Sequence, residues 1–156
     1  MRQESVLKAV LVFLAICITV LAVAVVPNSA ANMVEEFPAF AHLRMPGLVL
    51  VYLSLVPFYL DIWEAWKLLD MILSGEVFTE EAVRSLRRIR RYAMCISCIY
   101  AFALLSLLLL RVPYSTAYIT IALVILAALS GAVLASILRR LLVLAIDYKS
   151  ENDLTI

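Results

Sequence analysis

The chain has 156 residues and a formal net charge of +1, and hydrophobic residues make up 65% of it. Soluble domains contain about 45–50% apolar residues, so this composition excludes an ordinary water-soluble fold. The near-neutral net charge indicates no particular class of partner, and we expect no direct binding of nucleic acid.

Four apolar stretches account for most of the chain, at residues 6–26, 45–63, 92–112 and 117–146. A helix needs about 20 mostly apolar residues to cross the hydrocarbon layer of a bilayer, which is about 30 Å thick. Strands of a membrane barrel would alternate apolar and polar residues, whereas runs such as 104–110 are uniformly apolar. We therefore predict an all-α fold, a four-helix transmembrane bundle that forms a single domain over residues 1–156 and ends in a polar tail at 147–156.

Basic residues are distributed unevenly between the connections. The first end, the connection between the second and third spans, and the last end carry nearly all of them, whereas the other side has only Arg44 and Arg111. Since cytoplasmic segments carry the excess of Lys and Arg, we predict that both termini are cytoplasmic (N-in, C-in). The first apolar run is also longer than a signal peptide's, so we expect it to remain as a span in the bacterial cytoplasmic (inner) membrane. The basic residues of this side are Arg2, Lys8, Lys67, Arg84, Arg87, Arg88, Arg90, Arg91, Arg139, Arg140 and Lys149.

The first span is predicted to end at Pro27, because Asn28 and Ser29 follow it and complete a helix-stop signal. The outer connection, residues 27–44, is too short for a domain but long enough for a short helix in the membrane interface.

The second helix is predicted to continue beyond the membrane. Asp61, Glu64, Lys67 and Asp70 follow one another at steps of three, as in an amphipathic extension that leaves the inner interface. Gly75 then ends this helix.

The third helix is predicted to begin in the cytoplasm, about three turns before the bilayer. Thr79 is a typical N-cap, and Arg84, Arg87, Arg88 and Arg91 share one side of the turns that follow. The fourth helix is long enough to project past the inner surface as well, so helices two, three and four all extend into the cytoplasm.

Small residues recur along the fourth span as Ala127, Gly131 and Ala135, with Ala128 and Ala132 beside them. This spacing lets helices approach closely in lipid, where van der Waals packing drives association. Two interpretations remain open: the small residues form the packing seam inside one bundle, or they form the contact of a homo-oligomer.

Cys95 and Cys98 form a C-x-x-C pair on one side of the third helix, and membrane thiol redox proteins use such pairs. The pair lies near the cytoplasmic end, where thiols are kept reduced, and no second pair is present to pass electrons onward. The single histidine, His42, lies on the opposite side of the membrane. We therefore expect no catalytic residues, no metal site and no cofactor.

Charged side chains at the cytoplasmic end are the candidate partner-binding surface. The alternative is a solvated collar whose arginines anchor to lipid phosphates. The polar tail would contribute as a peptide with free backbone groups, suited to adding onto another protein. The candidate residues are Asp61, Glu64, Lys67, Arg84, Arg87, Arg88, Arg91, Glu151, Asn152, Asp153 and Leu154.

Several stretches resemble the bacterial family called domain of unknown function 2975 (DUF2975). They are the ending AIDYKSENDLTI at 145–156, the Pro-Phe-Tyr stretch at 57–59 that leads to Trp-Lys-Leu-Leu at 66–69, and Phe-Thr at 78–79 before the arginine-rich segment 84–91. The resemblance covers essentially the whole chain. It implies four spans, no assigned enzymatic activity, and a gene often encoded beside that of a small helix-turn-helix repressor, as for the membrane component of a regulatory pair.

Three functional hypotheses follow. The first is a non-enzymatic membrane protein that regulates or binds a small cytoplasmic helix-turn-helix transcription regulator. The second is a small oligomeric transporter, channel or transport accessory, assembled through the small residues of the fourth span. The third is a thiol redox protein that uses Cys95 and Cys98.

Overall fold

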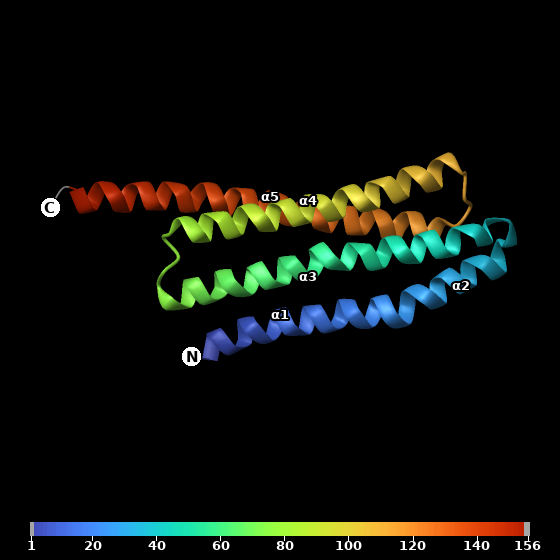
Figure 1. Ribbon diagram of the computed structural model, residues 1–156, viewed down its shortest axis with the longest axis horizontal. Coiled ribbons are helices and arrows are strands. Elements are labelled where there is room, and N and C mark those ends of the chain that lie inside the picture. The colour runs from blue at the N-terminus through green and yellow to red at the C-terminus, as the bar shows by residue number, and fades with distance from the viewer. Residues whose placement is uncertain (1, 155–156) are drawn as a thin grey trace.

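The computed structural model describes residues 2–154, which form four long helical rods (Figure 1). The first rod is continuous and comprises α1 (Arg2–Val20), the π-helical turn η1 (Leu21–Val25) and α2 (Val26–Glu36). A 3-10 turn, η2 (Pro38–Leu43), leads into α3 (Arg44–Ser74), and α4 (Glu80–Leu109) and α5 (Ser115–Leu154) complete the fold. Four helical segments are long and apolar enough to cross a membrane, which confirms the predicted fold class.

The rods run alternately up and down, so the N-terminus, the α3–α4 connection and the C-terminus all lie at one end (Figure 1). We call this the charged end, because it carries the arginines of α4 and Arg139 and Arg140 of α5. The placement of this end in the cytoplasm remains a prediction from the distribution of basic residues. At the opposite end the ring of Phe37 packs edge-on against Tyr114, with 6.2 Å between the ring centroids.

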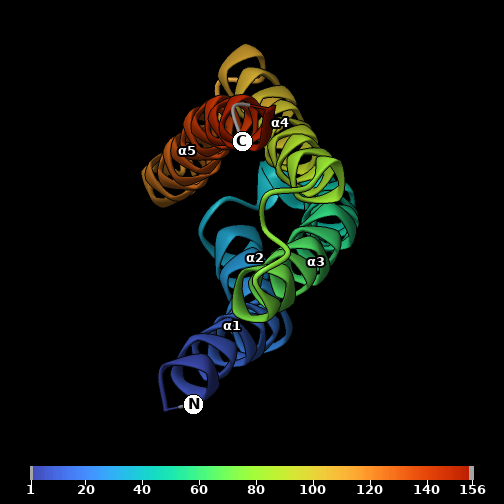
Figure 2. The same ribbon diagram turned by 90° about the vertical axis from the view of Figure 1, so that its left-hand side faces the viewer.

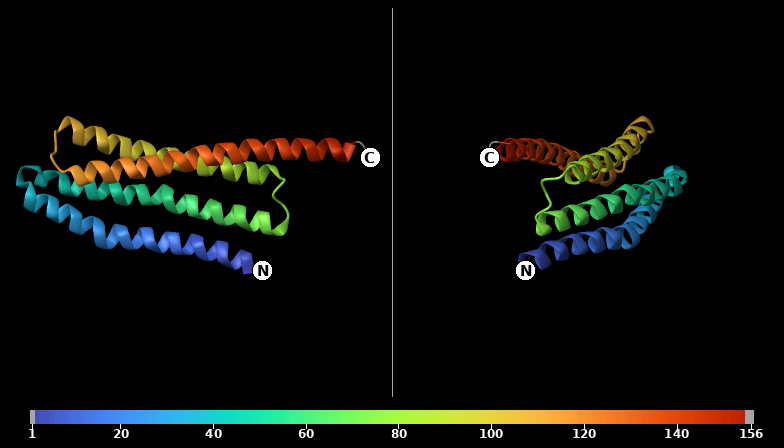
Figure 3. Two further views of the ribbon diagram at one scale, coloured as in Figure 1. Left: turned by 180° about the vertical axis from the view of Figure 1, so that it is seen from behind. Right: turned by 60° about the vertical axis from the view of Figure 1, so that its left-hand side comes forward.

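Each rod packs mainly against its neighbour in sequence, which gives a curved row when the molecule is viewed from the charged end (Figure 2). The first rod lies against α3, α3 against α4, and α4 against α5. The α4–α5 contact is the most extensive of the three. Beyond it α5 continues past the α3–α4 connection, so its last turns project from the bundle (Figure 3).

The predicted helix stop at Pro27 is absent from the structure. Pro27 is the second residue of α2, and the helix continues to Glu36. A proline has no backbone N–H to donate, so it normally interrupts the hydrogen bonds of a helix. Here a π-helical turn precedes Pro27 and changes the hydrogen-bond register, so the helix continues. Side chains also supply donors here, because Tyr52 of α3 donates to the carbonyl of Ala22 (3.2 Å) and Asn28 donates to that of Ala24 (2.8 Å).

The predicted break between the second and third helices is confirmed. Gly75 adopts a left-handed conformation (φ 79°) and donates to the carbonyl of Ile72 at 3.3 Å, while Glu76 donates to Met71 at 2.9 Å. This is a Schellman-type ending, in which glycine avoids the steric penalty of a side chain. Thr79 then accepts the N–H of Ala82 at 3.4 Å, as an N-cap.

The packing of α5 on α4 uses only part of the predicted small-residue seam. Ala132 and Ala135 are buried, with 3% and 4% of their surface exposed, whereas Ala127 and Gly131 are exposed. The intramolecular seam therefore follows the neighbouring line of small residues, and the Ala127–Gly131 side of α5 faces outward.

We predict that Ala132→Leu lowers the stability of the fold by about 1–3 kcal/mol, because it overpacks the α4–α5 contact. Gly131→Leu is the matched control, since nothing lies within 4 Å of a Cβ added at Gly131. Thermal unfolding of the detergent-purified protein measures both. Equal melting temperatures for the two variants would contradict the packing described here.

A second prediction concerns the sidedness of the bundle. Reporter tags at the N- and C-termini are expected to label from the cytoplasm, and a tag inserted at residues 112–114 from the outside. Labelling of the two termini from opposite compartments would be inconsistent with the arrangement in Figure 1.

Candidate functional site: a charged cluster between two helices

The carboxylate of Glu64 lies buried between α3 and α4 at the charged end. Only 6% of the residue is exposed, and its two oxygens accept from different α4 side chains. Ser85, which is fully buried, donates to Oε2 at 2.9 Å, and Arg88 donates to Oε1 at 3.3 Å. A charge this deeply buried persists only when it is paired and hydrogen-bonded, and Glu64 meets both conditions.

Two further charges close the charged cluster, which we define as Glu64, Lys67, Glu81, Ser85 and Arg88. Lys67 Nζ lies 3.7 Å from Glu64 and 3.9 Å from Glu81, and Arg88 Nη1 lies 3.6 Å from Glu81. Two cations therefore alternate with two carboxylates, and the cluster is neutral overall. Because it joins α3 to α4, it fixes the lateral position of one helix on the other.

Arg84 stands at the edge of the cluster. It pairs with Glu80 at 3.7 Å and with Glu81 at 3.9 Å, both within the first turns of α4. These side chains are exposed, and exposed pairs of this kind contribute little to stability.

Asp61 lies one turn before Glu64 on α3 and is half-buried. Its Oδ1 atom is buried and accepts no hydrogen bond from the described part of the chain. A buried polar atom without a partner is costly and is uncommon in folded proteins. Asp61 therefore offers a buried acceptor that no described donor uses.

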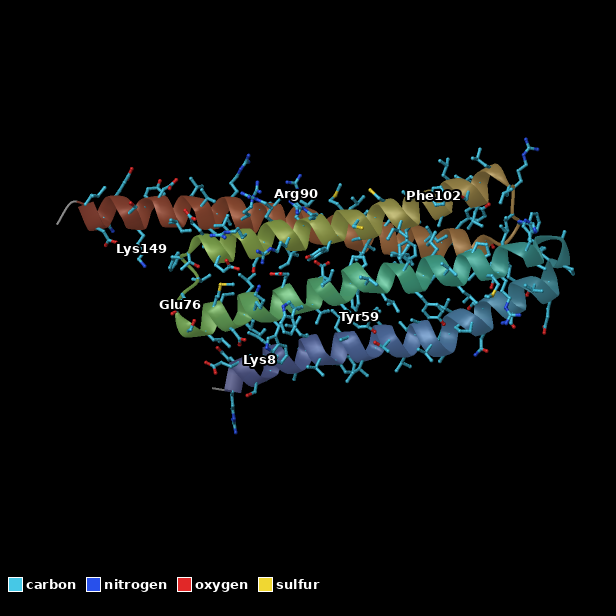
Figure 4. All side chains as sticks on the ribbon, in the orientation of Figure 1. Lys8, Tyr59, Glu76, Arg90, Phe102 and Lys149 are labelled. Atoms are coloured by element: carbon cyan, nitrogen blue, oxygen red, sulfur yellow. The ribbon has the colours of Figure 1, made fainter. Side chains whose placement is uncertain are left out.

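The first rod is attached to the same end by Lys8. Its ammonium group lies 2.6 Å from the carboxylate of Asp70 and 5.2 Å from the centre of the Trp66 ring, and Lys8 faces α3 (Figure 4). Farther along the first rod, the hydroxyl groups of Thr19 and Tyr59 form a hydrogen bond. Cation–π and ion-pair contacts thus help to position α1, which packs less extensively on α3 than α4 does.

The structure brings together four of the predicted site residues, Glu64, Lys67, Arg84 and Arg88. Arg87 and Arg91 are exposed on another side of α4 and form no ion pair within residues 2–154. The sequence-based set of candidate residues contains neither Glu81 nor Ser85. The signal for Ser85 is its spacing of three from Arg88, which places both on the side of α4 that faces α3.

The polar tail is helical, contrary to the expectation of a peptide with free backbone groups. Residues 147–154 continue α5, because no glycine or proline interrupts the sequence after Ile146. Glu151, Asn152, Asp153 and Leu154 are exposed on these last turns, and residues 155 and 156 lie outside the described residues. Lys149 lies over the ring of Phe78 at 5.6 Å, which attaches this part of α5 to the α3–α4 connection.

The cysteines are dispersed in the fold. Cys95 and Cys98 are exposed on α4 with free thiols, and Cys17 is half-buried on α1. Within residues 2–154, no group of three or more His, Cys, Asp or Glu side chains is placed to hold a metal ion. The redox hypothesis therefore rests on its sequence motif alone.

We predict that Glu64→Ala lowers the free energy of unfolding by about 1–3 kcal/mol, because it leaves the buried Ser85 hydroxyl without its acceptor and leaves Lys67 and Arg88 with Glu81 alone. Glu80→Ala is the control, because its side chain is 91% exposed and its single ion pair is worth about 1 kcal/mol at most. Thermal or denaturant unfolding in detergent measures both variants. A loss for Glu80→Ala as large as that for Glu64→Ala would exclude a structural role for the buried pair.

Comparison with known proteins agrees with this architecture. Residues 28–156 match the family described as protein of unknown function (DUF2975). The chain is also 37% identical over 152 residues to a protein of Bacillus subtilis (strain 168) named uncharacterized membrane protein YoaS, covering 96% of this chain and 95% of the relative. No solved structure matches. The four membrane-length helices and this relative identify a multi-pass protein of the bacterial cytoplasmic membrane, and the chain belongs to the DUF2975 family.

Proposed function

We propose that this protein is a non-enzymatic membrane component that binds a small cytoplasmic helix-turn-helix transcription regulator at its charged end. The observation that carries the proposal is the projection of α5 beyond the rest of the bundle (Figure 3). A helix of 40 residues is about 60 Å long, roughly twice the hydrocarbon thickness, so a large part of it must lie outside the lipid. Its polar turns at 147–154 present side chains that membrane insertion alone does not require.

The charges at this end divide into two groups with different roles. The charged cluster is neutral and satisfied internally, so it offers little to a partner. Arg87 and Arg91 are exposed without ion-pair partners in the described part of the chain, and Asp153 and Leu154 are exposed on α5. A partner surface with acidic groups for the two arginines, a basic group for Asp153 and an apolar group for Leu154 would complement this combination.

The cluster also supplies a mechanism for holding or releasing a regulator. Arg88 contacts Glu64 on one side of α4, and Arg87 and Arg91 lie on another side of the same helix. A signal that disturbs the Glu64 contacts would shift α4 on α3 and move both arginines with it. Ion-pair exchange at a helix interface is an established way to couple such movements.

A second candidate function is an oligomeric transporter, channel or transport accessory. The outward-facing Ala127 and Gly131 favour it, since small residues on a lipid-exposed helix surface allow a second helix to approach closely. A detergent-corrected molecular mass equal to one chain, with no flux in liposomes, would exclude this candidate.

We predict that a photoreactive amino acid at Asp153 crosslinks in native cells to a small helix-turn-helix protein. The same amino acid at Asn32, an exposed position of α2 at the opposite end of the bundle, is the control and should give no such product. Mass spectrometry of the crosslinked band identifies the partner.

The charge requirement is tested in the same cells. Arg87→Glu with Arg91→Glu should lower the yield of this product at least several-fold, because both side chains are exposed and available to the partner. A crosslink yield that this double variant leaves unchanged would argue against docking at the charged end.

A further inference from the structure

An open cavity of about 480 Å³ lies beside α4 and α5 at the charged end. Arg90 lines it from α4, and Arg139 and Arg140 line it from α5. Arg90 lies where α5 passes over α4 (Figure 4). The cavity is separate from the charged cluster, because Arg90 is five residues after Ser85 and therefore about 140° around the helix from it.

The three arginines lie at the depth where the hydrocarbon layer ends. Arg90 is about 29 Å along α4 from Leu109, and Arg139 is about 36 Å along α5 from Ser115, at about 1.5 Å of rise per residue. The hydrocarbon layer is about 30 Å thick, and helices cross it with some tilt. All three guanidinium groups therefore lie close to the plane of the lipid phosphates.

These guanidinium groups have no carboxylate partner within residues 2–154, whereas Arg84 and Arg88 on other sides of α4 do. Arginine stays charged at the membrane surface and presents a planar set of donors that fits phosphate oxygens. Three unpaired guanidinium groups around one cavity make the local electrostatic potential positive, which favours the binding of an anion.

Apolar side chains line the same cavity. Ile137, Leu141 and Leu144 form one stripe of α5, at spacings of four and three, and each has about half of its surface exposed. The arginine pair thus has apolar neighbours both before and after it along the helix. A fully hydrated anion would gain nothing from this stripe, whereas an amphiphile would cover it.

We propose that this cavity binds the headgroup phosphate of an anionic phospholipid, with Arg90, Arg139 and Arg140 contacting the phosphate and the α5 stripe contacting the carbons next to it. Basic pockets between transmembrane helices are known to hold acidic headgroups. The lipid contacts both α4 and α5, and so joins the two helices at this cavity. Free phosphate shares the anionic chemistry, and the apolar stripe favours the lipid.

Native mass spectrometry of the full-length protein tests this proposal. The protein is presented with equimolar phosphatidylglycerol and phosphatidylcholine in a mild detergent, and the bound lipids are counted. Wild type is expected to retain phosphatidylglycerol about tenfold or more over phosphatidylcholine, since each basic residue at the surface contributes measurably. The triple variant R90Q/R139Q/R140Q should bind the two lipids about equally.

The control variant R87Q/R91Q/K149Q removes the same charge from the same end but leaves the cavity intact, and it should keep the preference. Inorganic phosphate added at constant ionic strength should not displace the lipid. An equal loss of preference in the control variant, no preference in wild type, or displacement by phosphate would each overturn the proposal. If the triple variant does not fold, R90Q alone serves as the test, because Arg90 is exposed, and the preference must then fall several-fold.

Discussion

The buried carboxylate of Glu64 constrains the charged end of this protein more than any other group. A charge with 6% exposure requires partners, and all of its hydrogen-bonding and charged partners come from two helices, α3 itself and α4. Apolar packing in lipid tolerates sliding, because one aliphatic contact replaces another at little cost. The Glu64–Ser85 and Glu64–Arg88 contacts do not tolerate sliding, since a shift of one residue would remove both partners that α4 provides to the buried carboxylate. The ion pairs therefore set the register of α4 on α3.

Most of the fold follows from local sequence signals. The four spans, the glycine ending at Gly75 and the threonine cap at Thr79 each depend on a few neighbouring residues, and all three are present in the structure. The predicted helix stop at Pro27 failed because the group that compensates for the missing proline N–H comes from elsewhere in the chain. The donor that satisfies the Ala22 carbonyl comes from Tyr52, thirty residues later in another helix. No pattern around Pro27 reveals that contact.

The sequence predicted several residues of the candidate site but not which of them contact one another. Sequence reasoning named Glu64, Lys67 and Arg88, yet it could not show which arginine reaches a carboxylate and which faces outward. That outcome depends on the rotation of α4 about its axis, which tertiary packing decides. The small residues of α5 show the same limit, because Ala132 and Gly131 are adjacent in sequence and similarly small, and only the first is buried.

Helix α4 connects the features of the charged end, because three of its sides have different charged surroundings. Ser85 and Arg88 face α3, Arg87 and Arg91 are exposed, and Arg90 lines the cavity beside α5. A helix moves nearly as a rigid rod, so contacts on one side bias the positions available to the others. The contacts with α3 join α4 to the first rod through Lys8 and Asp70, whereas the α5 side joins it to the projecting turns. A partner bound to those turns and an anion bound near Arg90 would therefore both act on α4. In one position of α4 Glu64 keeps its partners, and in another it loses them. Each ligand would shift the equilibrium between these two positions.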